Sequence, residues 1–137
     1  MNDLIKYLLD YAFDREINLV LAKELDPSFP SCAISARRSI LINLNWKNHN
    51  ELPFIIAHEI SHILEDDPGV CYYSSATSRV KIEARANSRA IGLMLDYCQA
   101  NDIDVDNPLA FCDCFGVPTE YAYLVYLKLD TSKPDRR

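Results

Sequence analysis

The sequence lacks an apolar run long enough to cross a membrane, and it lacks an excess of basic residues. Of 137 residues, 14 are Lys or Arg and 20 are Asp or Glu, which gives a formal net charge of −6. The first absence excludes a membrane-spanning helix. The second argues against direct nucleic-acid binding, because phosphate contacts need clustered cations. Residues 1–10 also lack the basic start of a secretory signal, so we expect a cytoplasmic protein with no membrane partner.

Paired cysteines are scarce as well. The five cysteines include one C-x-C pair, Cys112 and Cys114, and no second pair that would complete four thiolate ligands. An odd count without a secretory signal indicates reduced thiols. A chain of this length folds without disulfides or a structural metal. We predict a single domain over residues 1–130 and a polar tail over residues 131–137, and we expect any bound metal to serve function.

The hydrophobic periodicity predicts helices and short strands in a mixed order. Alternation of apolar and polar residues over 39–45 is typical of a strand with one apolar face, and a helix over 50–64 tolerates Pro53 in its first turn. Thr77 or Ser78 is a candidate cap for a long helix reaching residue 99. The predicted helices are 3–16, 50–64, 78–99, 108–115 and 119–129, and the predicted strands are 18–22, 32–35 and 39–45.

One predicted helix contains an H-E-x-x-H motif, residues 58–62. Histidines four residues apart lie on the same helix face, so the imidazoles of His58 and His62 can bind one zinc ion. Glu59 lies about 100° further around the helix, where its carboxylate can act as a general base for an attacking water. The alternative is a helix with two incidental histidines. Two of the three histidines of the chain fall in this motif, which favours a zinc site.

Two histidines leave the ligand set incomplete, because catalytic zinc usually takes three protein ligands and a water. His49 precedes the helix, and no H-x-x-G-x-x-H continuation follows the motif. We therefore expect a carboxylate from the next helix, and Glu83 is the best candidate. The alternative for Glu83 is a surface ion pair with Lys81 or Arg85, which would contribute little.

Three further residues are candidates for supporting roles. Asn87 follows Glu83 by one helical turn and could hold a ligand or the neighbouring backbone in its orientation. Tyr72 and Tyr73 fall between the two metal-bearing helices, where a phenol could donate a hydrogen bond to the oxyanion of a tetrahedral intermediate. Packing is the alternative for a tyrosine in a loop.

Three motifs in order resemble the ImmA/IrrE family of small metallopeptidases. They are H-E-x-x-H at 58–62, E-x-x-A-N-x-x-A at 83–90, and A-x-x-x-x-F-G-V-P with a following alanine over 110–122. Ser61 stands where the family often has glycine, and Val125 and Tyr126 stand where an arginine is frequent. The resemblance implies an α+β, zincin-like minidomain, in which a small three-stranded sheet packs on two metal-bearing helices and a C-terminal helix pair follows.

The resemblance also implies an activity. His58, His62 and Glu83 would bind Zn²⁺, and Glu59 would be the general base. The substrate would be a partner repressor of the Cro/C1 helix-turn-helix type, often encoded on a phage or mobile element, and its cleavage would relieve repression. The main alternative is a regulator without catalysis that sequesters the repressor.

The candidate surfaces for binding the partner are the strand 39–45, the turn at Arg37 and Arg38, the loop 70–78 and the C-terminal helix pair, of which we favour the helix pair. The strand 39–45 would add a substrate strand if it formed the sheet edge. The C-terminal helix pair carries Tyr121, Tyr123 and Tyr126, which cannot all be buried and which resemble interface anchors. This pair also has the spacing of a helix-turn-helix, but it offers few residues that read base edges.

Overall fold

The structure is a computed structural model that describes residues 2–66 and 76–132. It is an α+β fold with five α-helices and three strands. Among the described helices, none is long and apolar enough to cross a membrane. The elements are α1 (Asn2–Asp14), β1 (Asn18–Ala22), β2 (Cys32–Ile34), β3 (Ser39–Asn43), α2 (Leu52–Leu64), α3 (Ala76–Ala100), α4 (Pro108–Phe115) and α5 (Ala122–Ser132), with short 3-10 helices η1 (Ser35–Arg37), η2 (His49–Glu51) and η4 (Thr119–Tyr121).

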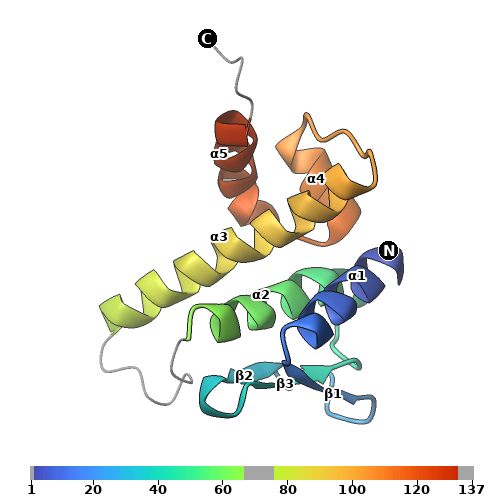
Figure 1. Cartoon of the computed structure of the whole chain (residues 1–137), viewed down its shortest axis with the longest axis vertical. Coiled ribbons are helices and arrows are strands. Elements are labelled where there is room, and N and C mark those ends of the chain that lie inside the picture. The colour runs from blue at the N-terminus through green and yellow to red at the C-terminus, as the bar shows by residue number, and fades with distance from the viewer. Residues whose placement is uncertain (1, 67–75, 133–137) are drawn as a thin grey trace.

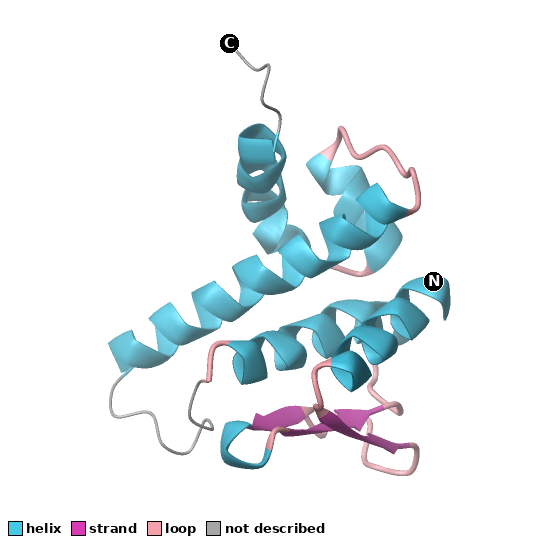
Figure 2. Cartoon of the chain, viewed as in Figure 1, coloured by secondary structure: helices cyan, strands magenta, loops and turns pink. Residues whose placement is uncertain are grey.

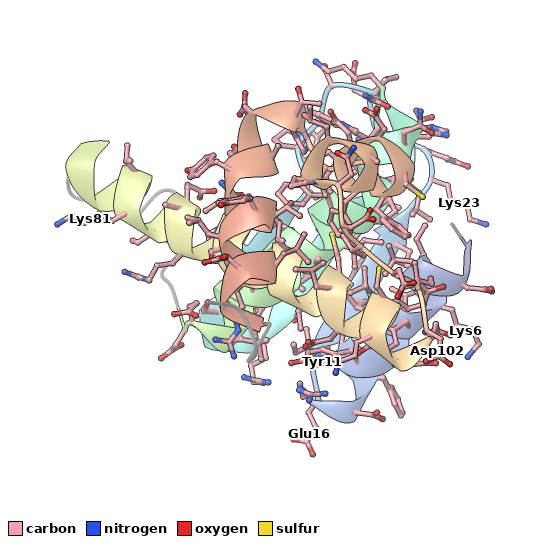
Figure 3. All side chains as sticks on the ribbon, turned by 90° about the horizontal axis from the view of Figure 1, so that it is seen from above. Lys6, Tyr11, Glu16, Lys23, Lys81 and Asp102 are labelled. Atoms are coloured by element: carbon pink, nitrogen blue, oxygen red, sulfur yellow. The ribbon has the colours of Figure 1, made fainter. Side chains whose placement is uncertain are left out.

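The elements are stacked in layers, with the sheet at one end of the molecule (Figure 1). Helices α1 and α2 cover one face of the sheet, α3 packs on α2, and the α4–α5 pair lies beyond α3 (Figure 2). The view from above shows α3 crossing the molecule, with Lys81 near its first end and Asp102 just beyond its last residue (Figure 3). Helix α2 is therefore central, between the sheet and α3.

The sheet has the order β1-β3-β2, with β1 parallel and β2 antiparallel to β3. Ile40 and Ile42 of β3 alternate into the core with 1% and 0% exposure. The condition for strand addition, that this strand forms the sheet edge, is not met, because β1 and β2 pair with both of its sides. A substrate strand therefore cannot add to β3.

The buried faces of the helices follow the predicted periodicity. In α1 the core residues Leu4, Leu8 and Ala12 recur every four residues. Ala86 and Ala90 of α3 are fully buried, and their small side chains let α3 lie close to α2. Helix α2 is apolar nearly all round, as expected for a helix covered on both sides.

Several helix boundaries differ from the predicted ones. Helix α1 ends at Asp14, and Glu16 takes a left-handed φ of 59° that stops further helical turns. Helix α3 begins at Ala76, so Thr77 and Ser78 lie inside it and cannot be its cap. Helix α5 continues to Ser132, beyond the predicted boundary at residue 130.

The C-terminal helix pair is anchored through the turn after α4. Gly116 caps α4 with φ 78°, and its N–H donates to the carbonyl oxygen of Cys112 at 2.9 Å. A Cβ at this position would overlap the carbonyl oxygen of Asn50, so the turn lies directly against η2. Val117 and Val125 are 3% and 0% exposed and belong to the main core. The pair is therefore part of the folding unit.

Candidate metal centre

The H-E-x-x-H motif lies in α2, and its two histidines are one turn apart on the same face. Their rings meet edge to face with centroids 4.6 Å apart, and their Nε2 atoms are 3.1 Å apart. The hydroxyl of Ser35 in η1 donates to the carbonyl oxygen of His62 at 3.4 Å. This contact links the turn between β2 and β3 to the second histidine.

Glu83 of α3 faces the two histidines with both carboxylate oxygens. Its Oε1 lies 2.9 Å from His58 Nε2, and its Oε2 lies 3.2 Å from His62 Nε2. The three residues form a group that could hold a metal ion. In contrast, Arg89 and Arg85 of α3 contact Glu65 at the end of α2, at 2.9 and 3.7 Å.

The donor atoms fit zinc in kind and in spacing. Two imidazoles and one carboxylate form a known ligand set for catalytic zinc, with a fourth position left for water. Zn–N bonds of about 2.0–2.1 Å imply about 3.3 Å between neighbouring donors of a tetrahedron. The two Nε2 atoms are 3.1 Å apart, and each lies near a different oxygen of Glu83, at 2.9 and 3.2 Å. One ligand atom from each of the three residues lies within 4.8 Å of the others, so a small shift of the side chains would place them around one ion.

The orientation of His58 adds a second observation. Its Nδ1 is buried without a hydrogen-bond partner, the one such side-chain atom in the described part of the chain. An unpaired buried polar atom costs about 1–3 kcal/mol. The ring nevertheless directs Nε2 toward Glu83 and His62. The orientation of Nε2, and not the unpaired Nδ1, is the feature that fits a metal ligand.

Glu59 is buried next to the donor group, with 9% exposure. Burial raises the pKa of its carboxyl to about 7, against the opposing effect of His58 and His62, and the charge of Glu83 raises it further. A carboxyl group with a pKa near neutral can accept a proton and release it again. Glu59 therefore remains the candidate general base beside the donor group.

The pKa of Glu83 shifts in the opposite direction. Burial by itself would raise it, but hydrogen bonds from His58 and His62, together with their charge, lower the pKa well below its usual range. Glu83 is therefore ionised at neutral pH, which is the form that binds a metal ion.

A cavity of about 330 Å³ opens beside the donor group. Its polar lining residues are His58, Glu59, Glu83, Asn87 and Glu51. Its other lining residues, which we call the apolar wall, are Trp46, Phe54, Ile55, Pro118 and Tyr121. We call this space the site cavity.

Asn87 and Tyr121 are neighbours in the site cavity. Asn87 is 7% exposed, one turn after Glu83 in α3. Burial raises the pKa of the Tyr121 phenol, and so does a hydrogen bond with Glu120, while a hydrogen bond with Asn87 lowers it. Both side chains line the site cavity.

The two tyrosines predicted for an oxyanion role, Tyr72 and Tyr73, lie outside the residues that the structure describes. The phenol that lines the site cavity belongs to Tyr121. Tyr121, Trp46 and Phe54 were not predicted to belong to the site. The helical spacing could have placed Phe54 at the site, because it precedes His58 by four residues and shares its helix face. Trp46 and Tyr121 have no such spacing, since tertiary packing brings them there.

Comparison with known proteins does not assign the chain to a family: no protein-family profile, no curated protein and no solved structure matches it. The resemblance to the ImmA/IrrE family therefore depends on the three sequence motifs.

Proposed function

We propose that the protein is a zinc-dependent endopeptidase. The observation that supports this most strongly is the convergence of His58, His62 and Glu83 with the buried carboxyl of Glu59 beside them. Structural zinc sites take four protein ligands, whereas catalytic sites take three and leave a position open. The donor group has three, and it borders a cavity.

Zinc, when bound, would lower the pKa of water and polarise the carbonyl group of the peptide bond. His58, His62 and Glu83 would hold the ion. Glu59 would accept a proton from the attacking water and return it to the leaving amine. The site cavity would accept the substrate next to these groups.

The proposed substrate is a repressor of the Cro/C1 helix-turn-helix type, as the family resemblance implies. Tyr123 and Tyr126 on α5 are 58% and 54% exposed, which makes this helix a candidate for repressor docking. Deleting the helix pair is not a suitable test of docking, because Phe111, Val117 and Val125 belong to the core. Replacing Tyr123 and Tyr126 together by serine leaves the core intact and should weaken repressor cleavage.

The test of the proposed function is co-expression with a Cro/C1-type repressor encoded next to this chain. Wild type should cleave the repressor, and Glu59→Gln should retain zinc but lose cleavage, because the amide cannot act as a base. General-base catalysis contributes about 10²–10⁴-fold, a loss that is visible on a gel. Relief of repression by Glu59→Gln without cleavage would instead establish sequestration.

A further inference from the structure

In the site cavity, aromatic rings of the apolar wall lie next to the candidate metal ligands. Phe54 precedes His58 by one turn of α2, and their ring centroids are 5.9 Å apart. The Tyr121 ring stacks on Phe54 at a centroid distance of 5.8 Å and an angle of 28°. The apolar wall therefore starts directly beside a metal-binding histidine.

Two contacts hold the apolar wall in place. The indole Nε1 of Trp46 donates to Glu51 Oε1 at 3.0 Å, which fixes the ring on one side. Pro118 and Tyr121 come from the far end of the chain, and the close approach of Gly116 to Asn50 holds them in place. The pocket is therefore preformed, as ligand pockets usually are.

The size and charge of the site cavity restrict its occupant. A volume of about 330 Å³ is at the small end of the 300–1,000 Å³ range of ligand pockets, which suits one side chain and its backbone. Glu51, Glu59 and Glu83 line it, and in the described part of the chain no Lys or Arg does. An acidic side chain that packed against the apolar wall would be buried without a Lys or Arg partner, at a large cost in free energy.

We propose that the site cavity is a specificity pocket that takes one uncharged apolar side chain, of leucine to phenylalanine size, from the residue next to the scissile bond. This inference rests on the proposed peptidase function, since it assigns the substrate residue that the same site selects. It also gives the C-terminal turn a direct role in recognition, through Pro118 and Tyr121.

Binding of small probes tests the pocket separately from catalysis. Trp46 is the only tryptophan of the chain, and it lines the cavity, so its fluorescence reports occupancy. The probes are the N-acetyl amides of phenylalanine, leucine, alanine, glutamate and lysine, titrated into zinc-loaded and zinc-free protein. The phenylalanine and leucine amides should bind about 10- to 100-fold more tightly than the alanine amide, the ratio expected for burying a large apolar side chain.

Two results of this titration would overturn the proposal. Equal affinities for all five amides would show that the cavity does not select side chains. Preferential binding of the lysine amide would show that Glu51 and the other carboxylates select a basic residue. Neither result depends on peptide cleavage, so the pocket can fail while the peptidase function stands. Conversely, selective binding without repressor cleavage would support the preference of the cavity for an apolar side chain and would count against the repressor as the substrate.

Variants of the wall identify the responsible side chains, with affinities measured by calorimetry. Tyr121→Ala should reduce the phenylalanine-to-alanine ratio at least several-fold, and Tyr121→Phe should restore it because the ring is retained. Phe13→Ala, which removes an aromatic ring 79% exposed on α1, is the matched control and should keep the wild-type ratio.

If circular dichroism shows that Tyr121→Ala does not fold, the variant Ile55→Lys tests the pocket instead. Ile55 is only partly buried in α2, so a lysine there can reach solvent while it places a charge in the pocket wall. This variant should keep zinc and lose the preference for the phenylalanine amide. A wild-type preference in Ile55→Lys would overturn the proposal.

The cleaved repressor gives an independent readout. Mass spectrometry of the fragments identifies both residues of the cleaved bond. One of them should be leucine, phenylalanine or a similar apolar residue, and replacing it by glutamate in the repressor should reduce cleavage by at least 10-fold. Charged residues on both sides of the bond would contradict the pocket.

Discussion

Replacing Gly116 by alanine should destabilise the protein by about 2–5 kcal/mol. The backbone of Gly116 has φ 78°, a left-handed conformation that costs a residue with a Cβ about 1–2 kcal/mol. The added Cβ would lie 2.6 Å from the carbonyl carbon of Asn50 and 3.2 Å from the Cα of Glu51. These are backbone atoms of η2 and cannot rotate away, so overpacking adds about 1–3 kcal/mol.

The matched control is Gly92→Ala in the middle of α3. A Cβ at Gly92 would meet only the flexible side chain of Lys128, at 3.6–3.9 Å, which is ordinary van der Waals contact. Alanine is favoured over glycine inside a helix by about 1 kcal/mol. This variant should therefore be as stable as wild type or more stable.

Urea denaturation followed by far-UV circular dichroism measures both variants. The midpoint should fall for Gly116→Ala and stay or rise for Gly92→Ala, with similar m values. Because Pro118 and Tyr121 follow this turn, the destabilised variant should also bind the phenylalanine amide less tightly. A Gly116→Ala protein within about 0.5 kcal/mol of wild type would refute the close packing of the C-terminal turn on η2.

Three further changes test the site and the scaffold. Glu83→Ala should reduce the zinc content from about one ion per chain to a small fraction. Glu65→Ala, which removes an acid paired with arginines on α3, is the control and should keep its zinc. Metal analysis distinguishes the two variants, and an unchanged zinc content in Glu83→Ala would require another ligand. Removing zinc with a chelator should lower the melting temperature by roughly 10 °C if zinc is present at 100 times its Kd; an unchanged melting temperature would contradict a bound ion. Asn43→Ala should lower the free energy of unfolding, measured with denaturant, by about 2–4 kcal/mol. The reason is that this fully buried amide donates to the carbonyl oxygens of Asp26 and Phe29 at 2.8 Å each. A loss below about 1 kcal/mol would mean that water replaces these hydrogen bonds.

Elements that depend on local sequence patterns could be predicted from the sequence. Strand β1 and helix α4 have the predicted bounds, 18–22 and 108–115, which the structure confirms. Both follow from local rules: apolar runs form strands, and Pro108 with Gly116 delimits a helix. The pairing of His58 with His62 is equally local, because a helix places residues four apart on one face. Glu83 was predicted from ligand chemistry, and the structure brings it to the histidines from another helix.

Tertiary structure decided what sequence periodicity does not encode. An alternating pattern predicts a strand over residues 39–45, of which the structure forms Ser39–Asn43. The pattern does not specify which strands pair with it, and β3 proved to be central. The site cavity joins Trp46 and Phe54 to Tyr121 from the C-terminal turn, across a sequence separation that no local pattern spans. The sequence by itself determined the chemistry of the candidate metal site, because ligand type and helical spacing are local properties. Only the tertiary structure determined the shape of its cavity, because that depends on how distant elements pack.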